Sequence, residues 1–253
     1  MWLWRDPETG WRAVGLIVFA SVAAAALATF RDYGLTWDEI AQATYGEKVA
    51  AWFTSGFRNH EALGYRNLTY YGGFADMLDW LAGRVAGSPP GQPGAGPFYY
   101  EARYLVTIAF GLVGLGATYR LAALVADARA GALAITALAL TPLYYGHFFN
   151  NPKDIPFAAL SACALYLIIG SARELPHVSV KSASLVAFAV GLTLAVRAGG
   201  VFVLGYVVLL WLAVLGHAWR RGLPVAPADL ARAAATLILV SAVAWALMLA
   251  CWP

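Results

Sequence analysis

The chain has 253 residues, of which 61% are hydrophobic and 12% are charged, and its mean hydropathy is +0.65. Because a water-soluble domain of this length needs far less apolar sequence, the composition excludes that class and predicts an all-α integral membrane protein. The formal net charge of +3 comes from cations in the short connections between apolar runs, so no nucleic-acid partner is expected.

Seven apolar runs have roughly the length needed to cross about 30 Å of hydrocarbon. They occupy residues 12–30, 102–119, 131–146, 155–170, 182–199, 201–219 and 233–251. We expect a single membrane domain over residues 1–253. In this domain a first span at 12–30 precedes an outer loop at 31–100, and six further spans follow in 101–253.

The first apolar run has a signal peptide as its alternative, since the small residues at 23–28 would suit a signal peptidase. The run, however, exceeds the usual length of about 7 to 15 residues. The leader also lacks a basic excess, because its two arginines are offset by Asp6 and Glu8. We therefore expect this segment to remain as a membrane helix.

The distribution of Lys and Arg among the connections predicts the orientation. With the N-terminus inside, nine cations and five acids lie on the inner side, and eight cations and nine acids lie on the outer side. Inner connections of membrane proteins carry the excess of Lys and Arg. We therefore expect a cytoplasmic N-terminus, with the first loop and the C-terminus outside the cytoplasm.

The outer loop contains two stretches with helical spacing of apolar side chains, at residues 38–57 and 70–85. In the second stretch Asp76, Asp79 and Arg84 are expected to form the polar side. Amphipathic stretches rich in Trp and Tyr are typical of helices that lie in the headgroup layer. Residues 88–97, rich in Pro and Gly, should break regular structure before the second span.

Polar side chains gather where spans meet water, and the parity of seven spans places every such group on the outer side. Charge near lipid is costly, so residues kept there are usually functional. We expect one site at the outer membrane surface, and its candidate residues are Asp38, Glu39, Arg103, His147, Asn151, Lys153, Asp154 and Arg197.

The two adjacent acids also have a structural alternative. Thr36 and Glu39 have the spacing of a capping box, in which the threonine caps the first amides and the glutamate reaches back. Glu39 is therefore explained equally well as a helix cap or as a catalytic partner. Asp38 has a weaker structural reason, because an acid in a first helical turn gains only from the helix dipole.

Residues 151–154 read as a helix start, since Asn151 precedes a proline and Asp154 falls in the first turn. Lys153 opposes the helix dipole at that position, so it predicts an anionic partner. Extension to the lipid headgroups would explain Arg103 and Arg197 equally well. A place on a polar rim explains His147 better than a role as a ligand does.

Carboxylates and cations at a membrane surface suit the transfer of a phosphate-linked group. A carboxylate can take the proton from an attacking hydroxyl, and cations stabilise the charge that grows on a departing phosphate. This chemistry requires no cofactor. A divalent ion held by Glu39, His147 and Asp154 is left open, since their spacing matches no recognised metal motif. Residues 111–116 carry spaced glycines within a span, which is typical of helix packing and gives a nucleotide donor no support.

A non-catalytic protein that binds or translocates a lipid phosphate would use the same cations. Transport paths, however, place acids or bases near the middle of the membrane. In this sequence the charges lie at the ends of the apolar runs. The pattern therefore favours an enzyme, and a non-catalytic protein that binds or translocates a lipid phosphate is the alternative.

Four stretches carry a resemblance to a known family. They are Tyr33–Glu39, Tyr70–Gly73, Glu101–Arg103 and Gly146–Phe157, and the run His-Phe-Phe-Asn-Asn-Pro-Lys-Asp within the last is the most specific. From about residue 30 onward the chain resembles the bacterial protein O-mannosyltransferase-like glycosyltransferases, which have the GT-C membrane fold.

The resemblance implies a seven-helix module of the bacterial inner (plasma) membrane, with a polyprenyl-phosphate sugar as donor. The acceptor would be a hydroxyl of a protein, lipid or polysaccharide, attacking the anomeric carbon in one inverting displacement. Asp38 matches the catalytic base, and Lys153 and Asp154 match a motif of the bacterial branch. Glu39 would orient its neighbour or contact a metal. The expected phosphate clamp consists of Arg103, Lys153 and Arg197.

Two departures from the family limit these expectations. Related transferases carry a Pro-Pro-x-x-Lys type segment late in the first loop, where this chain has Tyr70–Gly73, so Lys153 would have to replace that donor contact. Family members are also longer, so the chain is either a fragment or a minimal module. An inactive partner of a longer transferase is a further alternative, and the oligomeric state is left open.

Overall fold

The computed structural model describes residues 7–89, 91–92, 95–96, 98–222 and 225–253, and its regular elements in these ranges are helices. Asp6 in the leader and four residues of the segment 88–97 lie outside the described residues. The apolar helices are α1 (Pro7–Thr29), α4 (Tyr99–Val125), α5 (Ala128–Ala139), α7 (Asp154–Ala172), α8 (Val180–Val196), α9 (Gly200–Arg220) and α10 (Pro227–Cys251). The connections contain α2 (Glu39–Thr54), η1 (Glu61–Gly64), η2 (Leu68–Tyr70), α3 (Phe74–Val85) and α6 (Pro142–Gly146).

Five helices of the described ranges are long and apolar enough to cross a membrane: α1, α4, α7, α9 and α10. The other two apolar helices, α5 and α8, have 12 and 17 residues. At about 1.5 Å per residue they reach only about 18 Å and 26 Å, less than the hydrocarbon layer of about 30 Å. The prediction of a helical membrane protein is confirmed, and each expected span contains an apolar helix.

The third expected span, residues 131–146, is not one helix. The α5 helix ends at Ala139, and α6 begins at Pro142 after Thr141 in an extended conformation. Proline disfavours a helical conformation in the residue before it and cannot donate the backbone hydrogen bond that would continue the helix. Here the apolar run is broken by a local backbone constraint that its hydropathy conceals.

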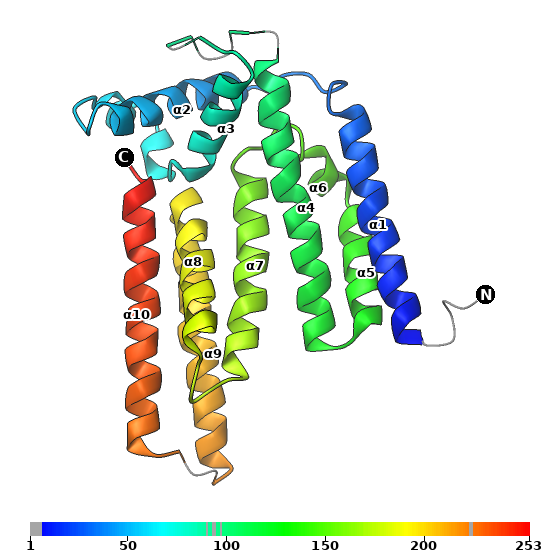
Figure 1. Ribbon diagram of the computed structural model, residues 1–253, viewed down its shortest axis with the longest axis vertical. Coiled ribbons are helices and arrows are strands. Elements are labelled where there is room, and N and C mark those ends of the chain that lie inside the picture. Colours follow the sequence, from blue (N-terminus) through cyan, green and yellow to red (C-terminus); the bar gives the residue numbers. More distant parts are fainter. Residues whose placement is uncertain (1–6, 90, 93–94, 97, 223–224) are drawn as a thin grey trace.

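The apolar helices form a bundle, and Figure 1 shows α2 and α3 lying across one end of it. One buried apolar cluster joins α7, α8, α9 and α10 around Trp211, whose indole nitrogen donates to the Ser171 hydroxyl at 3.3 Å. A second cluster joins α1, α4, α5 and the start of α7 around Phe148 and Phe149. The two clusters meet at α7.

The segments that carry the polar residues lie at one end of the bundle, as the parity of the spans predicted. The first loop, the start of α7 and the turn between α8 and α9 all lie at the same end, which is the upper end in Figure 1. The residues that follow α1 and those that precede α7 are therefore brought together although more than a hundred positions separate them in the sequence.

Two glycines fasten the first loop to the bundle. The Gly72 amide donates to the Val196 carbonyl at 3.2 Å, at the end of α8, and the Gly73 amide donates to the Cys251 carbonyl at 3.1 Å, at the end of α10. A Cβ atom on Gly72 would lie 1.8 Å from a backbone oxygen of Ala195. Glycine is needed here because the two backbones approach too closely for a side chain.

We expect Gly72→Ala to lower the free energy of unfolding by about 3 kcal/mol, the upper end of the overpacking range, because backbone rather than a flexible side chain must move. Gly64→Ala is the matched control, since a Cβ atom on Gly64 meets nothing within 4 Å. Thermal unfolding midpoints of both variants in detergent check the prediction. Equal midpoints would show that the loop is not held at Gly72.

Candidate functional site

A cavity of about 380 Å³ lies at the loop end of the bundle. Its walls come from the start of α2, the loop residues 66–71, the segment before α7 and the turn after α8. Six of the eight predicted site residues line it: Asp38, His147, Asn151, Lys153, Asp154 and Arg197. Arg103 and Glu39 are not among the described residues that do so.

Asp38 immediately precedes α2, and its carboxylate is exposed at the cavity. The capping-box alternative is wrong. Thr36 donates its hydroxyl hydrogen to the Asn150 carbonyl at 3.4 Å, and the Glu39 side chain is turned into the protein. Within the described part of the chain, α2 begins without a side-chain cap. Asp38 is thus the acid of the pair that remains available to a substrate.

Lys153 is buried in the floor of the cavity. Its ammonium lies 4.2 Å from the centre of the Tyr71 ring, 5.2 Å from that of Tyr45 and 3.9 Å from an Asp76 carboxylate oxygen. Burial lowers the pKa of Lys153, and the Asp76 carboxylate opposes that effect. Asp76 supplies the anionic partner that the unfavourable dipole position predicted.

Arg197, at the end of α8, supplies a second cation to the cavity wall. Its guanidinium is paired with the Asp154 carboxylate and lies 5.1 Å from the centre of the Tyr71 ring. Asn151 accepts a hydrogen bond from the Asp154 amide at 2.9 Å, and its side-chain amide donates to the Asp154 carboxylate at 3.0 Å. The α7 helix starts later than predicted, at Asp154 with Lys153 as its N-cap residue. The hydrogen bonds of Asn151 hold Asp154 against Arg197.

Arg103 and Glu39 lie in a second layer behind the cavity. Arg103, only 2% exposed, has a guanidinium nitrogen 3.3 Å from an Asp79 carboxylate oxygen. Glu39 accepts a hydrogen bond from the Tyr104 hydroxyl at 3.4 Å. Arg103 therefore does not extend to the lipid headgroups, and its buried guanidinium faces acids of the protein itself.

The two acids on the polar side of α3 are turned inward. Asp76 and Asp79 are each 1% exposed, whereas the apolar Leu81 and Val85 are exposed. The reason is the presence of two buried cations behind the helix, which attract the carboxylates. We call the resulting set of three acids and two cations the buried charge cluster: Glu39, Asp76, Asp79, Arg103 and Lys153.

Burial has a strong effect on the acids of this cluster. It raises the pKa of Glu39 to about 7 and that of Asp79 to about 7, although the nearby Arg103 charge lowers both. Burial also raises the pKa of Asp76, against the lowering effect of Lys153. With three acids against two cations, the cluster is neutral when one acid keeps its proton.

These shifts predict how stability depends on pH. A carboxyl whose pKa is raised from its ordinary value of 4.5 to about 7, as for Glu39, keeps its proton in the folded state after the unfolded state has released it. Its contribution is fully present below pH 4.5 and is lost as the pH rises towards 7, by up to about 1.4 kcal/mol per pH unit. We expect the thermal midpoint to fall between pH 4.5 and 7, with a smaller fall in Glu39→Gln. The exposed Asp32→Asn should behave as wild type, and an equal slope in all three would contradict the assignment.

The three residues considered for a divalent ion are not gathered at one point. His147 and Asp154 line the cavity, whereas Glu39 belongs to the buried charge cluster. Among the residues that the structure describes, no three His, Cys, Asp or Glu side chains lie close enough together to hold an ion.

Sequence reasoning missed Arg66, which lines the cavity as a third cation. Its backbone has a φ of 53°, in the left-handed region that non-glycine residues seldom adopt, and such strain concentrates at functional sites. Neither the left-handed backbone nor the place of Arg66 in the cavity wall has a signal in the local sequence. Tyr71, which contacts both Lys153 and Arg197, lies in a motif of the family resemblance, although no role was assigned to it.

No family model, curated protein or solved structure matches the chain. The fold and the cavity define a helical membrane protein with a polar site at one end of its bundle.

Proposed function

We propose that the chain is a membrane glycosyltransferase that moves a sugar from a polyprenyl phosphate to a hydroxyl acceptor outside the cytoplasm. One observation carries the proposal: an exposed carboxylate, Asp38, shares a cavity with the three cations Arg66, Lys153 and Arg197. The volume of about 380 Å³ lies within the usual range of small-ligand sites, roughly 300–1,000 Å³. A sugar phosphate is a ligand of that size and charge.

In the proposed reaction the Asp38 carboxylate accepts the proton of the acceptor hydroxyl. The hydroxyl oxygen then forms a bond to the anomeric carbon, while the bond from that carbon to the phosphate oxygen breaks. The electron pair of the broken bond leaves with the polyprenyl phosphate. A single displacement of this kind inverts the configuration at the anomeric carbon.

The cations would stabilise the negative charge that develops on the departing phosphate. Arg197 is suited to this role because a guanidinium can bind two phosphate oxygens at once. Its pairing with Asp154 fixes its direction before the donor arrives. We assign Arg103 a positioning role, since it supports Glu39 and Asp79 from behind and is not among the described residues of the cavity wall.

The proposed setting is the outer surface of a bacterial inner membrane, with α2 and α3 in the headgroup layer. Large apolar side chains on and beside these helices are exposed, among them Trp37 at 95% and Val85 at 82%. Side chains of this kind are stabilised by lipid and not by water. The excess of Lys and Arg at the opposite end of the bundle supports an orientation with that end in the cytoplasm.

The experiment is a transfer assay with purified protein in nanodiscs and a synthetic polyprenyl phosphate carrying a radiolabelled hexose. Fractionated bacterial envelope supplies protein, lipid and polysaccharide acceptors. We expect the label to move to one fraction with inverted anomeric configuration, and polyprenyl phosphate to be released in equal amount. Donor binding without any transfer would contradict the proposed enzyme activity and favour a non-catalytic protein that binds a lipid phosphate.

A further inference from the structure

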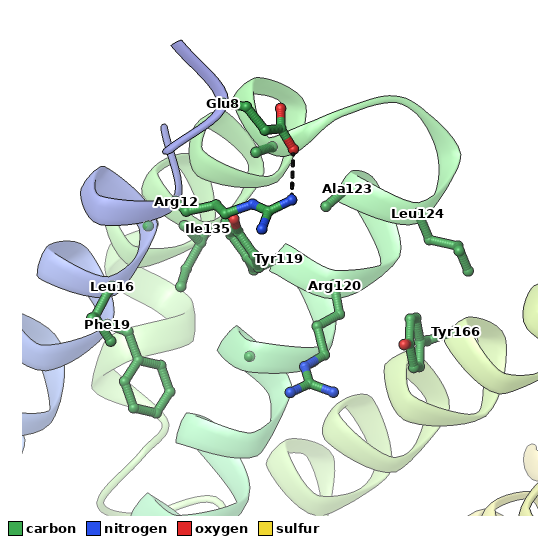
Figure 2. A pocket seen from close by; sticks show the side chains of 13 residues that line it. Glu8, Arg12, Leu16, Phe19, Tyr119, Arg120, Ala123, Leu124, Ile135 and Tyr166 are labelled. Carbon is green, nitrogen blue, oxygen red and sulfur yellow. Dashed lines mark hydrogen bonds and ion pairs between the residues drawn. The ribbon is translucent and has the colours of Figure 1, made fainter. Parts of the chain in front are cut away.

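A second cavity, of about 640 Å³, lies at the opposite end of the bundle from Asp38, between α1, α4, α5 and α7. Figure 2 shows two arginines in it, Arg12 from α1 and Arg120 from α4. The Tyr166 ring from α7 lies on the side away from α1. The proposed sugar transfer makes no use of this cavity.

The cavity continues as an apolar groove along α4. A neighbouring hollow of about 450 Å³ shares Phe19, Gly116, Arg120 and Tyr166 with it, and its other walls are apolar. The two hollows extend along α4 from Leu124 to Leu112. Twelve residues at about 1.5 Å each correspond to about 18 Å, close to the depth of one bilayer leaflet, which is half of about 30 Å.

The cavity contains a positive charge without a partner among the described residues. Arg120 has no ion pair or hydrogen bond with any residue in the described ranges. Arg12 pairs with Glu8 at 3.2 Å, one helical turn away, and exposed pairs of this kind contribute only about 0.3–0.5 kcal/mol. A stronger anion can therefore replace Glu8 at little cost.

Arginine at the end of a membrane helix commonly extends to the headgroup layer, and that explanation requires no specific ligand. Two features point further. Arg12 and Arg120 come from different helices and line the same hollow. The hollow opens into an apolar groove lined in part by the small residues Gly116 and Ala117, and the two hollows together have about the depth of one leaflet. Charge at one end and an apolar groove behind it match a phosphate headgroup and its acyl chain.

We propose that this groove binds one anionic glycerophospholipid from the leaflet opposite the Asp38 cavity. Its phosphate lies between Arg12 and Arg120, and one acyl chain runs along α4 between α1 and α7. The lipid fills the space between α1 and α7 and so stabilises the position of α1, because a ligand that binds only the folded state shifts folding towards it.

The test measures binding of phosphatidylglycerol and phosphatidylcholine to detergent-purified protein by native mass spectrometry, with thermal midpoints in parallel. We expect one phosphatidylglycerol to bind the wild type about 30-fold more tightly than phosphatidylcholine, as two cationic contacts would give. The double variant Arg12→Gln/Arg120→Gln should lose this preference. The matched control Arg220→Gln/Arg232→Gln removes two exposed charges from the same end of the bundle and should keep it.

A second variant separates the groove from the charges. Gly116→Leu places a side chain in the groove and leaves both arginines, and its Cβ atom meets only Phe19, at 3.9 Å. We expect Gly116→Leu to weaken phosphatidylglycerol binding about tenfold or more, as loss of roughly 1.4 kcal/mol of acyl-chain contact would do. Wild-type binding in Gly116→Leu, or equal loss in both double variants, would overturn the proposal. Sugar transfer is not part of either readout, so this result is independent of the proposed enzyme.

Discussion

Asp38→Asn is expected to lower the rate of sugar transfer by about 10²- to 10⁴-fold, the usual contribution of a general base. Asparagine has nearly the shape of aspartate but cannot accept the hydroxyl proton in the transition state. The cations of the cavity remain in place, so donor binding should change little. Steady-state assays with the polyprenyl-phosphate hexose should therefore show a large fall in kcat and a small change in KM.

Asp32→Asn provides the matched control for this result. Asp32 is exposed in the same loop six residues earlier, and it is not among the described residues that line the cavity. We expect it to transfer sugar at the wild-type rate. If Asp38→Asn were equally active, the transfer reaction would stand but the base would have to be another group.

The second large effect concerns the buried charge cluster, in which the two sides of one ion pair are expected to respond differently. Arg103→Met leaves three buried acids facing Lys153 alone, and removing one partner of a buried pair typically costs about 3–5 kcal/mol. Asp79→Asn instead leaves two acids and two cations, which balance. We expect it to cost less than about 1 kcal/mol at pH 7, because burial already favours the proton on Asp79.

Thermal midpoints at pH 7 in detergent measure this difference, and about 10 °C should separate the two variants in a chain of this size. The double variant Arg103→Met/Asp79→Asn should recover part of the loss, since it removes one acid that lacks a cation. Equal midpoints for the single variants would mean that Asp79 is fully charged in the folded protein. The neutral-cluster assignment would then be wrong.

Much of the fold could be predicted from hydropathy, because a lipid-facing helix must be apolar over most of its length. Each of the seven apolar helices overlaps a predicted span but begins before its predicted start, and the helices over residues 39–54 and 74–85 fall within the two stretches predicted in the first loop. The position of the first loop, the start of α7 and the turn after α8 at one end of the bundle followed from the parity of the spans alone. The break at Thr141 was missed because hydropathy measures side chains, whereas Pro142 acts on the backbone.

Sequence reasoning grouped the residues of the site correctly, but it did not separate those that line the cavity from those buried behind it. Asp38, Lys153 and Arg197 share the cavity as expected, yet Arg103 and Glu39 lie behind it. An amphipathic pattern gives the separation of polar and apolar faces but not which face turns inward, because lipid accepts the apolar face as readily as a protein core does. The inward direction of α3 depends on Arg103 and Lys153, which are distant in sequence, so no local window contains it.

The fastening of the first loop to the ends of α8 and α10 also determines the order in which the site can be assembled. The Trp252 indole donates to the Thr69 carbonyl at 3.1 Å, and Gly73 bonds to Cys251, so loop residues beside Arg66 and Tyr71 depend on partners made about 180 positions later. A nascent chain that has inserted α1 to α9 already contains Asp38, Lys153 and Arg197, but one wall of their cavity has no anchor. We therefore expect the site to become competent only after α10 enters the membrane, which would keep an unfinished chain from acting on its donor.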